Sequence, residues 1–151
     1  MKITDITVNR VRAPQGENAK SFVGRPGRLI LQIHTDEGIS GISEAGRNLK
    51  VVRSYLDELI KPILIGADPR RPRKIWELLT LGDGQQATRY PSQIVGSIDV
   101  ALWDITGKAA GMPIYQLLGG ARRTEIPLYW SRGNGWSKSP EQMLEEVQEG
   151  Y

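Results

Sequence analysis

The side chains that carry most enzymatic chemistry are scarce in this chain. Its 151 residues include no cysteine and a single histidine, His34. The lack of cysteine excludes a disulfide framework, a thiolate nucleophile and a cysteine-ligated metal, and it is compatible with a reducing, cytoplasmic setting. A Ser-His-Asp triad would have to use His34, and a zinc site built on several histidines is excluded. His34 lies two residues after Gln32 in an expected strand, so both side chains would lie on the same face. We expect a structural histidine.

The carboxylates do not form a catalytic pair. Asp99 and Asp104 flank Trp103 in a strongly helical segment, and a spacing of five places them on different helix faces. We expect one to bridge to a basic neighbour and the other to be solvated, with Trp103 in the core or at a domain interface. Glu44 ends a strand, where we expect a hydrogen-bond acceptor or an ion-pair partner.

Four basic residues are the most suggestive candidates for binding a ligand. Three of them lie in or just after a long polar loop, and the fourth follows the next hairpin; they are Lys20, Arg25, Arg28 and Arg47. Arginine offers a planar fork that binds carboxylates through two parallel hydrogen bonds. The two loops could converge over one surface, so the sequence predicts an anion-binding rim, with ordinary surface bases as the alternative.

The segments that would position these residues begin with three expected strands. Alternating apolar residues predict strands at 2–12, 29–33 and 39–44, and Gly38 supplies a turn with positive φ between the last two. The spacing Gly38 to Gly41 lacks the third glycine of a dinucleotide fingerprint, so we interpret it as a narrow hairpin strand. The sequence predicts a three-stranded antiparallel meander.

Helical periodicity follows the hairpin. An apolar stripe predicts a first helix with one buried face, formed by Leu49, Val52, Leu56, Leu59 and Ile63. A short helix is expected around Ile75 to Leu79. The strongest helix starts near Ser92 and ends at Gly111, and another short helix covers 114–118.

The last thirty residues have a different pattern. Residues 126–131 predict a short strand, and Ser139, Pro140 and Gln142 predict the capped start of a helix. A single strand of a parallel sheet has no partner within its own β/α unit. We therefore expect an α+β domain at 1–120 and an incomplete β/α segment at 121–151.

Charge and length exclude several classes of function. The net charge is +3 and the basic residues stand singly or in pairs, which disfavours nucleic-acid binding. Neither a membrane span nor a signal peptide is indicated by the apolar residues. A complete (β/α)₈ barrel takes about 250 residues, so this chain cannot contain one.

Two motifs carry a resemblance to a known family. They are the hairpin sequence T-D-E-G-I-S-G-I-S-E at 35–44 and the helix sequence S-I-D-V-A-L-W-D-I-T-G-K-A at 97–109, continued by G-M-P-I-Y-Q-L-L-G-G at 111–120. In these motifs the chain resembles the mandelate racemase/muconate-lactonising branch of the enolase superfamily. Ser43 departs from the family pattern, which has glycine there, and this concerns the local hairpin packing.

The resemblance implies an enolase-like N-terminal capping domain, followed by the first strand and helix of a (β/α)₈-type barrel. In such enzymes the barrel holds Mg²⁺ and the catalytic bases, so we expect no catalytic or metal-ligating residue in this chain, and we expect the chain alone to be inactive. The resemblance places two substrate-facing loops at 14–27 and 45–49. The residues expected to face substrate are Phe22, Arg25, Arg47 and Asn48, with Lys20 as a weaker candidate.

The reaction implied is removal of the proton α to a carboxylate, with the metal stabilising the enolate. Polar, basic loops favour a hydroxylated acid, so we expect an acid-sugar dehydratase, with a racemase, epimerase or cycloisomerase as the alternative. A non-catalytic fragment that serves only in binding or oligomerisation is the alternative of another class. The expected partners are a small carboxylate substrate, the barrel domain and further copies in a homo-oligomer, without nucleic acid or membrane.

Overall fold

The computed structural model describes residues 1–11, 27–81, 90–128 and 138–148. The chain divides into two compact units, Met1–Gly120 and Ala121–Tyr151.

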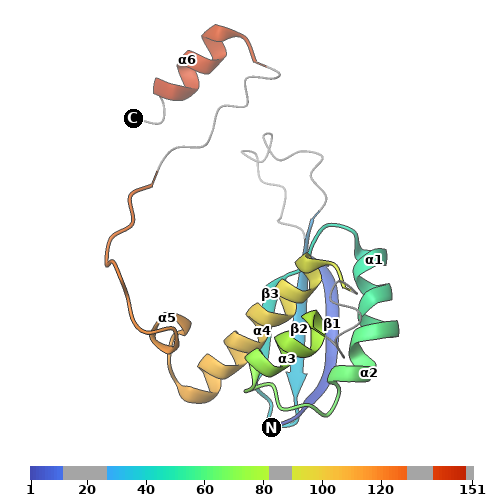
Figure 1. Cartoon of the computed structure of the whole chain (residues 1–151). Helices are drawn as coiled ribbons and strands as arrows, with labels where there is room; N and C mark the ends of the chain where they lie inside the picture. The colour runs from blue at the N-terminus through green and yellow to red at the C-terminus, as the bar shows by residue number, and fades with distance from the viewer. Residues whose placement is uncertain (12–26, 82–89, 129–137, 149–151) are drawn as a thin grey trace. The chain divides into compact units, whose positions relative to one another are not determined.

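The first unit contains the predicted meander. Strands β1 (Ile3–Val11), β2 (Arg28–Thr35) and β3 (Ser40–Glu44) form one antiparallel sheet in the order β1-β2-β3 (Figure 1). Thr7 pairs with Gln32, and Gln32 pairs with Ile42. Gly38 has a φ of 76° in the β2–β3 turn, as predicted. The three strands predicted for this unit are therefore confirmed.

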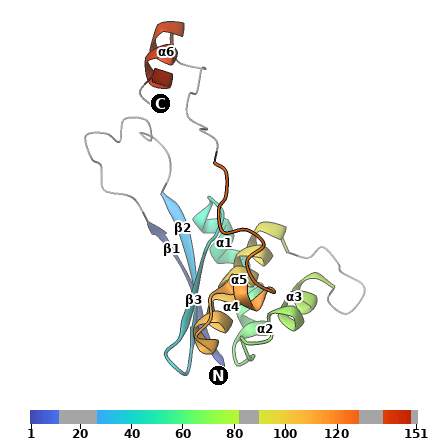
Figure 2. The same ribbon diagram turned by 90° about the vertical axis from the view of Figure 1, so that its left-hand side faces the viewer.

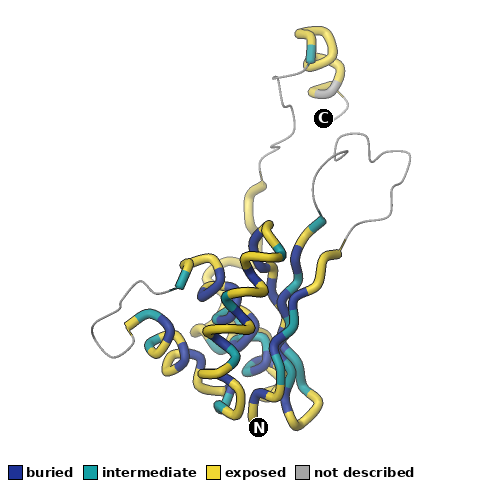
Figure 3. Tube along the Cα trace, turned by 90° about the vertical axis from the view of Figure 1, so that its right-hand side faces the viewer, coloured by how far each residue is buried: buried dark blue, intermediate teal, exposed yellow. Residues whose placement is uncertain are grey.

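Helices cover one face of the sheet, and no described helix of this unit lies on the other face, as Figure 2 shows. The covered face carries the buried side chains Ile6, Val8, Leu29, Leu31 and Ile33. The period of two places alternate residues on opposite faces, and Figure 3 shows buried positions alternating with intermediate or exposed ones along the strands. Each fully buried aliphatic side chain contributes about 1.5–3 kcal/mol to folding.

The helices follow in the predicted order. They are α1 (Leu49–Ser54), a π-helical segment η2 (Tyr55–Ile60), α2 (Lys61–Leu64), α3 (Pro72–Thr80), α4 (Ser92–Ala110) and α5 (Ile114–Leu117). Helix α4 packs on β2 and β3, and α1 packs on β1. The C-terminal cap of α4 is Gly111 at a φ of 64°, as predicted.

The predicted stripe on the first helix was wrong beyond Leu56. The buried residues are Val52, Leu56, Ile60 and Leu64, whereas Leu59 and Ile63 are each 38% exposed. The cause is the wider turn of η2, in which the Lys61 N–H bonds the Leu56 carbonyl five residues back. Pro62 lacks an N–H and disfavours a regular α-turn at this point. The residue added in this wider turn shifts the inward positions from 59 and 63 to 60 and 64.

The second unit contains α6 (Pro140–Gln148). The predicted capping box is confirmed, because the Ser139 N–H donates to Gln142 Oε1 at 3.0 Å and the Gln142 N–H donates to Ser139 Oγ at 3.4 Å. The strand predicted at 126–131 is wrong at 126–128, which have no regular structure, and 129–131 lie outside the described residues. A strand needs a hydrogen-bonded neighbour, and no described residue pairs with 126–128.

Candidate functional site

The segment that joins β3 to α1 holds two of the predicted substrate-facing residues, Arg47 and Asn48. Both are exposed. The other three, Lys20, Phe22 and Arg25, lie outside the described residues. Of the two predicted loops, the structure describes the one at 45–49, whose last residue, Leu49, begins α1 (Leu49–Ser54). Whether the two loops converge stays a prediction.

Asn48 is the N-cap of α1. Its Oδ1 accepts a hydrogen bond from the Val51 N–H at 3.3 Å, with Asn48 itself in an extended conformation. An asparagine side chain at this position replaces a missing helical partner of the first turn. The cap fixes where the segment enters the helix, and this role was not predicted from the sequence.

Arg47 stands apart from the other basic candidate that the structure describes. Arg28 forms an ion pair with Glu44, with 2.7 Å between Nη1 and Oε1, so the prediction that Glu44 is a structural partner is confirmed. Arg47, which follows Gly46 at a φ of 52°, makes no hydrogen bond or ion pair with any described residue. Its guanidinium is therefore the better candidate for an external anion.

The remaining polar candidates have structural roles. Thr7 Oγ1 lies 3.0 Å from His34 Nε2, which confirms the prediction of a structural histidine. Asp104 pairs with Lys108 at 2.7 Å, as expected for one member of the Asp99/Asp104 set. Asp99 was expected to be solvated, and this is wrong: it is half-buried, and desolvation raises its pKa. Trp103 is also half-buried.

Gly41 and Ser43 determine how the hairpin packs against α4. A Cβ on Gly41 would overlap the Ala101 carbonyl oxygen of α4, so glycine at this position allows the strand and the helix backbone to approach closely. Ser43, where the family pattern has glycine, is buried, and its Oγ has no hydrogen-bond partner among the described residues. The departure at Ser43 therefore leaves the hairpin intact with one unsatisfied hydroxyl.

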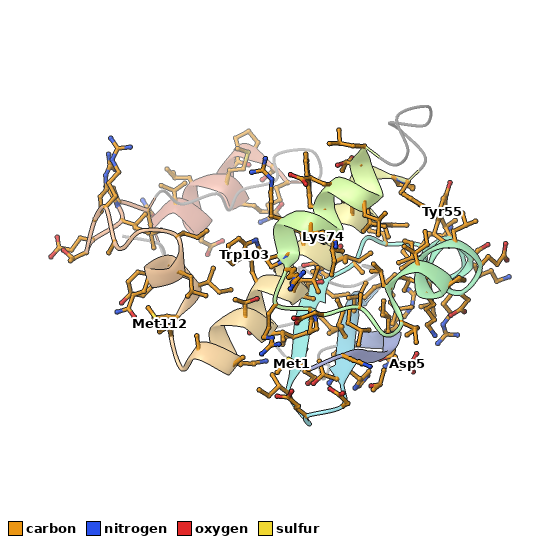
Figure 4. The ribbon with its side chains drawn as sticks, turned by 60° about the horizontal axis from the view of Figure 1, so that its bottom comes forward. Met1, Asp5, Tyr55, Lys74, Trp103 and Met112 are labelled. Carbon is orange, nitrogen blue, oxygen red and sulfur yellow. The ribbon has the colours of Figure 1, made fainter. Side chains whose placement is uncertain are left out.

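A hollow of about 550 Å³ lies at the other end of α4, lined by residues that include Asp104, Lys108, Met112 and Tyr115. Figure 4 shows Met112 next to α5 and Tyr55 among the side chains of the first helices.

Within the described residues no three acidic, histidine or cysteine side chains gather as metal ligands. No described helix is both long and apolar enough to cross a membrane. The described part of the chain thus presents an exposed arginine at 47 and no cluster of metal ligands.

Comparison with known proteins gives a consistent family. The sequence profile described as "Mandelate racemase / muconate lactonizing enzyme, N-terminal domain" matches residues 3–119. A D-galactonate dehydratase family member from Halomonas elongata is 43% identical, with 89% of this chain and 35% of the relative covered. A D-mannonate dehydratase from Novosphingobium aromaticivorans is 40% identical, with 88% and 34% covered.

A solved structure agrees with these relatives. An enolase from Agrobacterium radiobacter with bound sodium and L-malate superposes with a TM-score of 0.64 at 32% identity, covering 82% of this chain and 29% of that protein. The present chain spans about a third of the length of the curated relatives it matches.

Proposed function

Because the chain belongs to the mandelate racemase/muconate lactonizing enzyme family, we propose that it is the N-terminal capping part of a dehydratase that acts on a sugar acid. Residues 1–120 are then the capping domain, and 121–151 begin the barrel domain. The observation that carries the proposal is the family match over 3–119, together with two relatives named as dehydratases of D-galactonate type and of D-mannonate.

The proposed reaction removes the proton α to the carboxylate and expels the hydroxyl group on the next carbon as water. Family membership implies a divalent metal, Mg²⁺ in this proposal, which stabilises the enolate. The described residues of this chain offer no ligand set for it. In our proposal the metal and the bases belong to the part of the longer relatives that this chain does not span, and the chain alone is inactive.

The role of this chain is to bind and enclose the acid. Arg47 carries a free guanidinium among the described residues, and its fork fits a carboxylate. Asn48, whose carbonyl oxygen already caps α1, still offers its amide hydrogens to a substrate hydroxyl. Lys20, Phe22 and Arg25 would complete the enclosure from the other loop. L-malate, a hydroxy acid with two carboxylates, is bound by the enolase from Agrobacterium radiobacter, which supports an anionic, hydroxylated substrate.

The test is to express the complete reading frame that contains this chain and to supply it with Mg²⁺ and a panel of aldonic acids. We expect a 2-keto-3-deoxy acid as product. Exchange of the α-proton with solvent deuterium without loss of water would favour a racemase or epimerase instead. Neither dehydration nor exchange with any acid of the panel would overturn the proposed enzyme class and support the non-catalytic alternative.

A further inference from the structure

The free edge of β3 is closed by side chains of α4. Three polar residues on one face of the helix reach alternate residues of the strand, each at a backbone group that points away from β2. The Lys108 ammonium donates to the Ser40 carbonyl at 2.8 Å, Asp104 Oδ2 accepts from the Ile42 N–H at 2.9 Å, and the Ser97 hydroxyl lies 2.8 Å from the Glu44 carbonyl. The helix face thus takes the place of a fourth strand.

This arrangement depends on the close approach at Gly41. The strand and the helix touch there, because a Cβ on Gly41 would overlap the Ala101 carbonyl and Ile105. The spacings 97, 104 and 108 are two turns and one turn of a helix, so the three side chains share a face. The contacts run in opposite directions along the two elements, because residues 97, 104 and 108 of the helix contact residues 44, 42 and 40 of the strand in that order.

The contact between Ser97 and Glu44 lies next to the Ala45–Asn48 segment. Ser97 Oγ is also 2.7 Å from the Gln93 carbonyl, so one hydroxyl hydrogen serves the carbonyls of Gln93 and Glu44. A Cβ on Gly46 would lie 3.3 Å from Gln93 Oε1, which places that side chain against the backbone just before Arg47. The Ala45 N–H donates to the Leu29 carbonyl at 2.8 Å on the other side.

We propose that Ser97 is a positioning residue for substrate binding: by holding the Glu44 carbonyl, it fixes the direction in which the Ala45–Asn48 segment leaves β3 and presents Arg47. The inference rests on the proposed function, because it takes Arg47 as the group that binds the acid. Ser97 itself is buried and does not touch the substrate. Gln93 supports the same segment from the surface of α4.

The first experiment uses the 151-residue chain and compares Ser97→Ala with Thr106→Ala. Both hydroxyls bond a carbonyl four residues earlier in α4, but among the described residues only that of Ser97 also reaches β3. We expect the amide resonances of residues 45–48 to move in Ser97→Ala and to stay in place in Thr106→Ala. If Ser97→Ala does not fold, Gln93→Ala tests the same segment from an exposed position. Unmoved resonances at 45–48 in the folded variant would overturn the proposal.

The second experiment measures kinetics in the complete protein. Loss of one hydrogen bond that orients Arg47 should raise KM for the acid about fivefold in Ser97→Ala, with kcat nearly unchanged. A general loss of structure would lower kcat and the active fraction instead. If Arg47→Ala raises KM and Ser97→Ala does not, the positioning role is wrong. If neither raises KM while the resonances move, the binding role proposed for Arg47 has failed, and the contact of Ser97 with the segment stands.

Discussion

At the scale of the residue, Gly41 sets how closely the sheet and α4 approach. Gly41→Ala should destabilise the fold by about 2–4 kcal/mol, because the new methyl group would overlap helix backbone that cannot move aside. Gly96→Ala is the matched control, because a Cβ there meets nothing within 4 Å. Alanine in a helix should raise the free energy of unfolding by about 0.5–1 kcal/mol relative to glycine. Urea unfolding of both variants checks the prediction, and equal stabilities would contradict the close contact.

Ser43 offers a second test of the same layer. Its buried hydroxyl has no partner among the described residues, and an unsatisfied buried polar group costs about 1–3 kcal/mol. Ser43→Ala should therefore leave stability unchanged or raise it by about 1 kcal/mol. A clear loss in thermal unfolding would show that the hydroxyl has a partner.

Asp68 links stability to pH. Hydrogen bonds from the Arg70 side chain and backbone lower its pKa to about 2, against about 3.9 in an unfolded chain. A lowered pKa stabilises the fold above pH 4, and that contribution disappears as the pH falls towards 2. Asp68→Asn should be less stable than the native chain at pH 6, with a difference that shrinks below pH 4. A difference independent of pH would argue against this ion pair.

Residue types alone predicted part of the candidate site. His34 and Glu44 were interpreted correctly because a lone titratable group at a strand position is usually satisfied locally. Arg47 was found from the chemistry of its fork and its place after a hairpin. The edge contacts of Ser97 and Lys108 were missed, because they depend on how closely α4 approaches β3 at Gly41. Asp99 was misjudged for a similar reason, since its burial depends on tertiary packing.

At the scale of the element, the segment from α1 to α2 gives the clearest difference between sequence and structure. Regular α-helical spacing predicts Leu59 and Ile63 inside, but the π-helical turn before Pro62 places Ile60 and Leu64 there. The strands were predicted well because the alternation of apolar and polar residues can be recognised in each strand without knowing which elements pack against it. A π-turn changes the register of every later residue and leaves little trace in the pattern.

Two leucines test this register. Leu64 is fully buried and Leu59 is 38% exposed. Leu64→Ala should cost about 2–5 kcal/mol through the cavity it leaves, whereas Leu59→Ala should cost less than about 1 kcal/mol. Denaturant unfolding compares the same substitution at two positions of one element. The reverse order would restore the regular helix and contradict η2.

At the scale of the whole molecule, we propose that this chain binds substrate and does not carry out the chemical step. The described residues supply an exposed arginine and an asparagine cap in one segment, and no cluster of metal ligands. The family relatives are about three times longer than this chain. The proposed division of labour therefore places recognition of the acid here and proton abstraction in the barrel.

The most direct test of that assignment is the kinetic effect of Arg47→Ala in the complete protein, with Lys74→Ala on α3 as a control that also removes one exposed positive charge. We predict that Arg47→Ala raises KM for the preferred sugar acid at least about tenfold, as expected for loss of a charge-assisted pair, and that Lys74→Ala leaves KM unchanged. An unchanged KM in Arg47→Ala, or equal effects of the two variants, would contradict the proposed role of Arg47 in binding the acid.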